Sequence, residues 1–216
     1  MAKITAIEPQ KRDPDRVNIH LDGNYAFGLS RITAAWLKVG QELSDEKIVS
    51  LQAQDDRERA YQQAMLFLGY RPRSEAEIRQ NLDKHEFSPD VIEQVLDRLR
   101  QNRLADDGQF AHTWVENRNT FRPRSRRALQ IELRQKGLSD EVTRSALEGL
   151  DEEALAYAAG LKKARRLQSE DWNGYRKKLT DHLARRGFPY PVIASVISRL
   201  WNETHTEQKF DYEEEP

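Results

Sequence analysis

The sequence contains no cysteine among its 216 residues, and it has few glycines and prolines. The absence of cysteine excludes a disulfide scaffold, a thiol nucleophile and a zinc site with cysteine ligands, and it agrees with a reducing compartment. No apolar run approaches the roughly 18 residues that span a membrane. The first residues, Met-Ala-Lys-Ile, lack the apolar core of a signal peptide. We therefore expect a soluble, cytoplasmic protein.

The motifs of catalytic and cofactor sites are missing as well. The five histidines are scattered, none of them three or four residues from another, and no cluster of Asp and Glu has metal-ligand spacing. The sequence contains no phosphate-binding loop, no GxGxxG after a strand and no GxSxG. We expect no catalytic residues, no metal and no cofactor. An enzyme whose site is assembled from distant residues is a weak alternative.

The balance of residue types favours helices. Charged residues make up 33% of the chain and hydrophobic residues 38%, which suits amphipathic helices around a thin core better than a sheet protein. The formal net charge of −1 indicates no partner by itself. The distribution of charged residues along the chain says more about possible partners, because the middle of the chain is basic and the segment from Glu203 is acidic.

The N-terminal segment alone has the alternation typical of strands. Apolar residues alternate with polar ones over residues 17–21 and 25–29, and Asp22-Gly23 lies between the two runs. This pattern predicts a β-hairpin with a type I′ turn, since that turn needs two positive φ angles. Residues 3–7 are a candidate third strand. Two helices are then expected, a short one from Ser44 through Leu51 and a longer one over 56–68.

One two-helix unit is repeated in the helical region, which extends from about residue 30 to 203. Residues 71–99 and 122–150 align without a gap and are identical at nine of 29 positions, including Arg-Pro-Arg-Ser at the start of each. A degenerate third copy begins 101 residues after the first and keeps mainly the apolar positions. Two unrelated amphipathic helices would share apolar positions but not an in-register Arg-Pro-Arg-Ser.

Each copy carries the start and stop signals of its helices. A capping box is predicted in the first copy, where Glu77 stands three residues after the N-cap. Gly137 and Gly187 are each followed by a large apolar residue, which predicts glycine C-caps. The serines interpreted as helix caps rather than nucleophiles are Ser74, Ser88, Ser125 and Ser139.

A similar helix precedes each pair, so the predicted fold is mainly α: a tandem array of three three-helix modules with a small N-terminal β-hairpin. Because each module buries little apolar surface, we expect neighbouring modules to stack or to share helices. The expected divisions are 1–54 for the hairpin and short helices, 55–104, 105–150 and 151–203 for modules 1, 2 and 3, and 204–216 for an acidic disordered tail.

Unpaired basic charge is confined to modules 2 and 3. In module 1 basic residues alternate with acidic ones, as on a solvated helix face. Residues 118–136 contain seven basic residues against Glu132 alone, and residues 162–186 contain nine against three acidic ones. Either segment could be a solvated face, but the first favours an anionic partner, a phosphate backbone or an acidic protein surface. The predicted basic face consists of Arg118, Arg122, Arg124, Arg126, Arg127, Lys162, Lys163, Arg165, Arg166, Arg176, Lys177 and Lys178.

Several runs of residues carry a family resemblance. They include Arg-Pro-Arg-Ser-x-x-Glu-Ile at 71–78, Phe-Ser-Pro-Asp-Val-Ile at 87–92, Leu-Ala-Asp-Asp at 104–107 and Glu-Leu-Arg-Gln-Lys-Gly-Leu at 132–138. These runs resemble the RecX family of bacterial regulators of the RecA recombinase. The resemblance covers about residues 56–200 and is weaker in module 3. Ser125 and Glu86 depart from it, since many members have Gly there, and both concern loop shape.

The resemblance implies a function. It implies a regulator, mainly an inhibitor, that binds RecA and RecA–DNA filaments and modulates ATP hydrolysis, strand exchange and co-protease activity in DNA repair, homologous recombination and the SOS response. It implies protein–protein interaction without enzyme activity, by a monomer that has no membrane contact and binds DNA directly only weakly. The alternative is a non-catalytic DNA-binding protein that uses the basic surfaces of the helical repeat.

Overall fold

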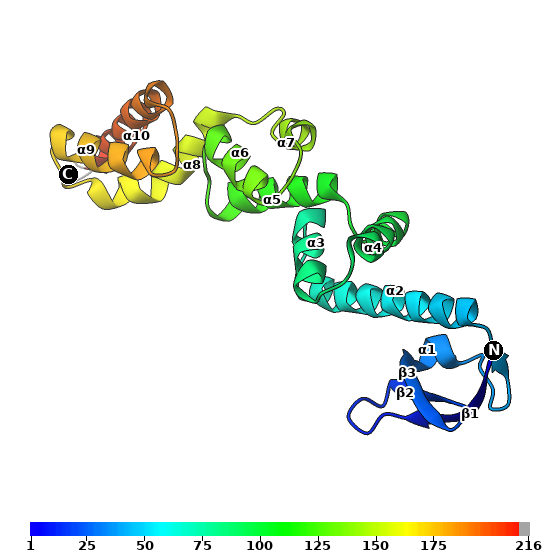
Figure 1. The fold of residues 1–216 in the computed structure, drawn as a ribbon. Helices are drawn as coiled ribbons and strands as arrows, with labels where there is room; N and C mark the ends of the chain where they lie inside the picture. Colours follow the sequence, from blue (N-terminus) through cyan, green and yellow to red (C-terminus); the bar gives the residue numbers. More distant parts are fainter. Residues whose placement is uncertain (212–216) are drawn as a thin grey trace. The chain divides into compact units, whose positions relative to one another are not determined.

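In the computed structural model (Figure 1), the backbone of residues 1–211 and the side chains of residues 1–204 are described. The chain divides into two compact units, Met1–Ala105 and Asp106–Pro216. The first unit contains the N-terminal sheet and module 1, and the second contains modules 2 and 3. The predicted fold class, mainly helical with three three-helix modules after an N-terminal set of strands, is confirmed.

The N-terminal segment is an antiparallel sheet with the strand order β3-β2-β1-β4. The predicted hairpin and third strand are both present, and a fourth strand pairs with the other edge of β1. The fourth strand is only two residues long, which is too short to show an alternation in the sequence. The strands are β1 (Ala2–Pro9), β2 (Arg16–Leu21), β3 (Asn24–Ser30) and β4 (Glu42–Leu43).

The turn of the hairpin has the predicted geometry. Asp22 has a φ of 49° and Gly23 a φ of 86°, as a type I′ turn requires. The alternation buries Ile19 on one face of the sheet, together with Ile4 and Leu29. Because side chains in a strand point to opposite faces in turn, one apolar set is enough to form this small core.

Helix α2 (Asp45–Tyr70) is continuous, so the prediction of a short helix followed by a separate one over 56–68 is wrong. Asp55 lies in the polar stretch between these two predicted helices. Asp55 is instead buried, because its carboxylate accepts a hydrogen bond of 2.6 Å from the backbone N–H of Ser30 and lies 3.1 Å from Nη2 of Arg16. The expected division at residue 54 therefore falls inside a helix.

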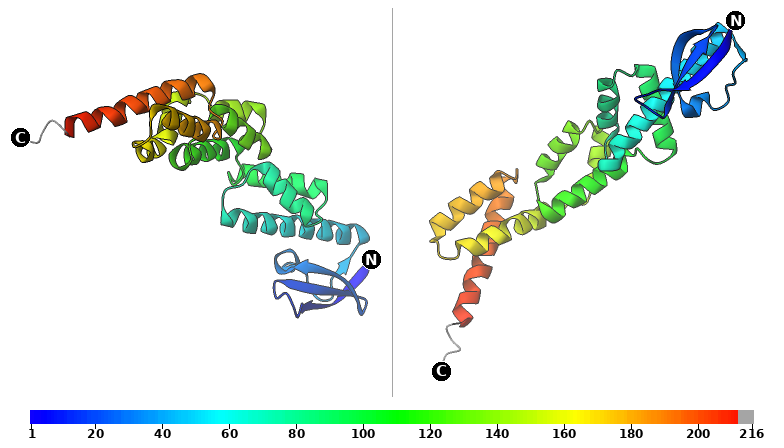
Figure 2. Two further views of the ribbon diagram at one scale, coloured as in Figure 1. Left: turned by 90° about the vertical axis from the view of Figure 1, so that its left-hand side faces the viewer. Right: turned by 90° about the horizontal axis from the view of Figure 1, so that it is seen from below.

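Helix α2 contributes residues to two hydrophobic cores, that of the sheet and that of module 1. Near its N-terminus Leu51 packs into the core of the sheet, which also contains residues of the short helix α1 (Arg31–Ala34). Further along, Ala60 and Ala64 belong to the core of module 1. The first half of α2 lies beside the sheet in both views of Figure 2. The sheet and module 1 are thus joined by a helix and not by a loop.

Module 1 consists of the second half of α2 with α3 (Glu75–Lys84) and α4 (Pro89–Gln101). The predicted apolar stripe faces the core, where Ile78, Leu82 and Leu96 are fully buried. The loop between α3 and α4 passes through Glu86, whose φ is 62°. A left-handed backbone costs a residue with a side chain roughly 1 kcal/mol, which explains why glycine is common at this position in the resembling family.

Modules 2 and 3 repeat the same plan. Module 2 contains α5 (Asp107–Phe121), α6 (Arg126–Gln135) and α7 (Asp140–Ala146). Module 3 contains α8 (Glu152–Ala164), the 3-10 turn η1 (Arg165–Leu167), α9 (Trp172–Ala184) and α10 (Tyr190–Asp211). Helix α10 packs against α8 and α9 (Figure 2). It continues through Asp211, so the prediction of a disordered tail that begins at 204 is wrong for residues 204–211. Residues 212–216 of that expected tail lie outside the described residues.

The predicted helix caps are confirmed. The side chains of Ser74, Ser88, Ser125 and Ser139 each accept a hydrogen bond from the backbone N–H three residues later. The capping box of Ser74 and Glu77 is complete. Gly137 and Gly187 have φ angles of 81° and 85° and follow the ends of α6 and α9. The serines therefore fulfil the structural role that their spacing predicted.

Each module has a hydrophobic core of its own, so of the two expected arrangements, stacked modules or shared helices, the described cores do not show shared helices. The three cores form separate clusters of buried residues, and the sheet has a fourth. Within the second unit, modules 2 and 3 meet through loops. The backbone N–H of Ser125 donates to the carbonyl of Arg186 over 3.1 Å, so loop contacts rather than a common helix connect these two modules.

Candidate functional site

No group of three or more His, Cys, Asp or Glu that could hold a metal ion occurs among the described residues. Nor does any helix within that part of the chain have the length and apolar character needed to cross a bilayer. The capping serines are occupied by backbone N–H groups. The candidate site is therefore sought on the charged and apolar surfaces.

Five arginines of module 1 form ion pairs with acidic residues of the same module, in agreement with the alternation of charges in its sequence. Arg100 contacts both Glu75 and Asp97, and Arg98 lies 2.9 Å from Glu58. Further pairs are Arg59–Asp56, Arg71–Glu77 and Arg79–Glu93. Ion pairs of this exposed kind contribute little to stability, but they leave module 1 without an excess of positive charge for an anionic partner.

In module 2 a single carboxylate neutralises part of the predicted basic face. Glu132, whose side chain is 14% exposed, accepts hydrogen bonds from Nε1 of Trp114 (2.9 Å) and Nε of Arg118 (2.8 Å). Its other oxygen lies 3.1 Å from Nε of Arg124. Arg118 also stacks over the Trp114 ring, 4.7 Å from its centroid. Arg118 and Arg124 are thus held by the protein itself.

The other three arginines of this cluster differ in their surroundings. Arg126 donates through its backbone N–H to Glu152 over 3.1 Å and through Nη2 to the carbonyl of Leu150 over 3.3 Å. Arg122 and Arg127 are exposed, and neither forms an ion pair with a described carboxylate. Of the five predicted residues, these two are the most available to a partner.

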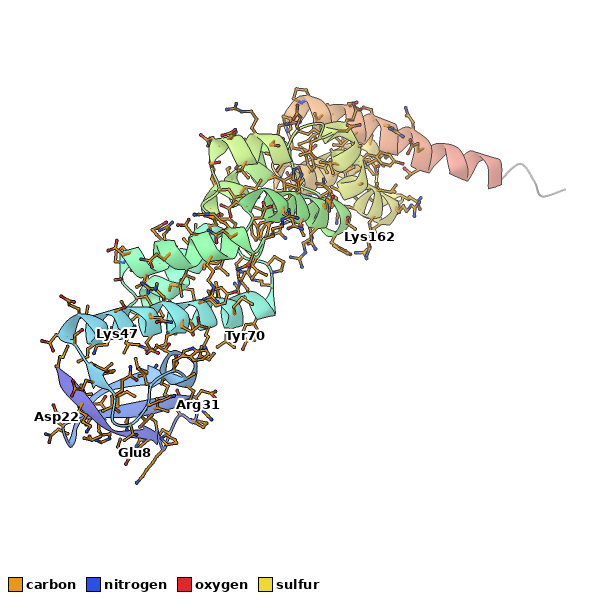
Figure 3. All side chains as sticks on the ribbon, turned by 90° about the vertical axis from the view of Figure 1, so that its right-hand side faces the viewer. Glu8, Asp22, Arg31, Lys47, Tyr70 and Lys162 are labelled. Atoms are coloured by element: carbon orange, nitrogen blue, oxygen red, sulfur yellow. The ribbon has the colours of Figure 1, made fainter. Side chains whose placement is uncertain are left out.

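Module 3 presents more uncompensated charge. Lys178 pairs with Glu170 at 2.5 Å, and Arg176 donates to the hydroxyl of Tyr190 over 2.8 Å. Lys162 is exposed on α8 (Figure 3). The predicted residues for which no ion pair is found among the described side chains are Lys162, Lys163, Arg165, Arg166, Arg176 and Lys177.

The structure also brings together two loops that the sequence did not connect. Residues 122–125 lead into α6 and residues 185–188 lead from α9 into α10, and Ser125 in the first loop is fully buried against the second. A Cβ on Gly187 would come within 2.6 Å of the Ser125 hydroxyl. These backbone contacts fix Arg124 and Arg186, the neighbours of Ser125 and Gly187, at one junction.

Several positively charged side chains lie near one another at this junction. Burial lowers the pKa of Arg186, and the nearby charges of Arg124 and Arg185 lower it further. The Arg186 guanidinium lies 3.3 Å from the carbonyl and from Nδ1 of His182, and no ion pair with a described carboxylate accompanies these contacts. Burial is also the main cause that lowers the pKa of His182, and the charges of Arg186, Arg185 and Lys163 add to it.

Sequence reasoning did not include Arg185 and Arg186 in the basic face. A signal was available, because Arg-Arg stands directly before Gly187, the residue that aligns with the helix-ending Gly137. The alignment alone did not show that this loop lies against residues 122–125. That proximity follows from the packing of module 3 on module 2.

A second surface is apolar. Met65, Leu66 and Tyr70 are exposed near the end of α2, where with Gln62 and Gly69 they line a shallow depression. Tyr70 is 85% exposed (Figure 3). Trp36, after α1, is 88% exposed. Exposed apolar side chains that gather in this way are typical of surfaces that contact other proteins.

Comparison with known proteins assigns a family to this architecture. Four family profiles match consecutive parts of the chain: the regulatory protein RecX N-terminal domain at residues 2–44, and the first, second and third three-helix domains of RecX at 60–99, 106–147 and 151–197. The regulatory protein RecX of Bacillus subtilis (strain 168) is 32% identical over 219 residues, which cover 97% of this chain and 82% of that protein. The chain belongs to the RecX family.

Further RecX proteins agree in sequence and in fold. The regulatory protein RecX of Prosthecochloris aestuarii is 38% identical over 145 residues, covering 67% of this chain and 95% of that protein. A crystal structure of regulatory protein RecX superposes with a TM-score of 0.68 at 29% identity and covers 91% of this chain and 98% of that one. RecX from Lactobacillus salivarius shares the fold with a TM-score of 0.61 at 22% identity, covering 68% of this chain. The two curated relatives and the first of these structures are named regulatory proteins, and so the family is a regulatory one.

Proposed function

We propose that this protein regulates, mainly as an inhibitor, the RecA recombinase in the bacterial cytoplasm. It binds RecA and RecA–DNA filaments as a monomer and modulates ATP hydrolysis, strand exchange and co-protease activity in recombinational repair and the SOS response. Membership of the RecX family of regulatory proteins carries the proposal. In this proposal the protein acts by binding, without a cofactor and without catalytic residues of its own.

The surface features support a role in binding. The apolar residues at the end of α2 suit a protein partner, since such patches are rare on proteins without one. The uncompensated charge of modules 2 and 3 suits an anionic partner, and a protein filament formed on DNA offers both kinds of surface. A small-molecule substrate would instead call for an enclosed pocket with converging polar groups.

The direct test is the DNA-dependent ATPase of purified RecA. We expect this protein to suppress the ATPase at or below one molecule per RecA, and to shorten the filaments seen by electron microscopy. An unchanged ATPase together with unchanged filament length would refute the proposal. A variant in which Arg122 and Arg127 are both replaced by Glu should inhibit less while its far-ultraviolet circular dichroism stays the same.

A second candidate function is direct DNA binding without RecA. It is favoured by Arg122, Arg127 and the basic residues of α8, which have no described carboxylate partner. Phosphate contacts release counterions, so affinity for DNA should then fall steeply with salt, by about 0.7 to 0.9 logarithmic units of affinity per logarithmic unit of salt for each phosphate contacted. A flat salt dependence, or no binding in the absence of RecA, would refute this second function.

A further inference from the structure

The junction of modules 2 and 3 holds a half-buried cation, Arg186, that has no acidic partner among the described side chains. Arg186 donates to His182, which is a neutral contact, while Arg124 and Arg185 repel it. Glu132, the carboxylate that pairs with Arg124, is already shared with Arg118. A partly desolvated charge in such surroundings is costly unless an anion neutralises it.

The cations of the junction come from three separate elements. Arg124 belongs to the loop before α6, Arg185 and Arg186 to the loop after α9, and Lys163 to α8. The carbonyl of Ala159, one turn before Lys163 on α8, lies 3.1 Å from Nε2 of His182, which links α8 to the same place. The hydrogen bond from Ser125 to Arg186 sets the distance between the two loops. Contacts within the protein therefore set the relative positions of the backbone segments that carry these cations.

We infer that this junction is a phosphate-binding site for a nucleic acid strand, formed by Lys163, Arg124, Arg185 and Arg186. Planar guanidinium groups bind phosphate oxygens through paired hydrogen bonds, and a lysine adds a point charge. Glu132 offsets only one of the two positive charges of Arg118 and Arg124, so the junction keeps an excess of positive charge, and successive phosphates of a strand supply repeated negative charge to meet it. The inference rests on the proposed function only in that it places DNA among the ligands.

Exposed basic residues flank the site on both modules, which favours an extended polyanion over a single small anion. Arg122 lies two residues before Arg124 in the first loop, and Arg166 lies three residues after Lys163 beyond the end of α8. Neither has an ion pair with a described carboxylate. The junction therefore supplies the fixed centre of the site, and the flanking residues supply additional contacts along the strand.

The test uses the full chain and a fluorescent single-stranded oligonucleotide, with binding measured by anisotropy over a range of salt concentrations. Lys163 and Arg185 are both replaced by Glu, and the matched control replaces Arg12 and Lys38, two exposed cations of the N-terminal segment. Loss of two phosphate contacts should lower the salt slope by about 1.4 and the affinity on the order of 50-fold at 50 mM salt. The control should bind like the wild type.

Two further measurements identify the ligand. An oligonucleotide with uncharged methylphosphonate linkages should bind the wild type and the junction variant equally weakly, since it has no charge to recognise. If the junction variant binds the ordinary oligonucleotide as tightly as the control does, the site is refuted. Selective loss of binding to a polyglutamate peptide would likewise refute it, in favour of an acidic protein. Replacement of Lys163 and Arg185 by Gln serves if the Glu variant does not fold.

The RecA ATPase assay separates this inference from the proposed function. Wild-type protein that binds the oligonucleotide through the junction but leaves the RecA ATPase unchanged would refute the regulatory proposal and support the phosphate site. Wild-type protein that suppresses the ATPase, with a junction variant that binds DNA as the control does, would refute the site and support the regulatory proposal.

Discussion

Glu132 is expected to stabilise module 2 more than any exposed ion pair of the chain. Its carboxylate receives Trp114 and Arg118 at one oxygen and Arg124 at the other, and it is 14% exposed. A hydrogen bond to a charged group contributes about 1.5–3 kcal/mol to stability. Because Arg124 is 41% exposed, its share is reduced by solvent screening. Replacement of Glu132 by Ala should therefore cost about 3 kcal/mol in the free energy of unfolding.

The measurement is urea unfolding followed by far-ultraviolet circular dichroism. With a slope of about 2 kcal/mol per molar urea, the midpoint for the unit that contains module 2 should fall by about 1.5 M. Replacement of Glu132 by Gln keeps the volume and one acceptor, so a smaller loss of about 1–2 kcal/mol is expected. Glu148, an exposed glutamate of the same module, is the control, and its replacement by Ala should change little. Equal midpoints for the Glu132 and Glu148 variants would show that the shared carboxylate has no structural role.

Four other predictions concern single positions. Replacement of Gly187 by Ala should destabilise the second unit by more than about 1 kcal/mol, since φ is 85° and the new Cβ would meet Ser125; a rise in melting temperature would contradict this. Replacement of Asp55 by Ala should cost about 3–5 kcal/mol by leaving the charge of Arg16 behind, and an unchanged urea midpoint would argue against it. Replacement of Glu86 by Gly should stabilise module 1 by roughly 1 kcal/mol, measured in the same way, because φ is 62° there. The pKa of His182 is lowered in the fold, so its contribution to stability is present above the unfolded pKa of about 6.5 and is lost as pH falls below it; unfolding of a His182→Gln variant should lose that part of the pH dependence.

The sequence predicted the helical repeat well because its signals are local. A serine before an apolar stripe and a glycine after it specify where a helix begins and ends, and these residues lie within one turn of the groups they bond. The same holds for Asp22 and Gly23, whose φ angles depend on the turn alone. The continuous α2 was missed for the opposite reason. Asp55 looks like a polar break, and only the distant Ser30 and Arg16 make its burial favourable.

The candidate site was predicted in part. Counting charges along the chain found the basic middle segment, but it gave Arg118 and Arg124 the same weight as Arg122. Their difference depends on which cations contact Glu132, and the order of residues along the chain does not specify those contacts. Arg186 was missed because its position depends on a contact between two modules. Charge density in a sequence thus indicates a region, while the partners of each cation determine which residues are available.

Helix α2 sets the rotation of the sheet about module 1 as well as their separation. The sheet holds the helix at Leu51 and Asp55, and module 1 holds it at Ala60 and Ala64. One residue inserted between Asp55 and Ala60 would turn one attachment by about 100° against the other while moving it only about 1.5 Å along the axis. Natural insertions at this place should therefore be rare in relatives, whereas loops such as the one between β1 and β2 can change length freely. Because α2 is attached to both, it fixes the orientation of the sheet relative to module 1. Any partner that touches both therefore meets them in that one orientation.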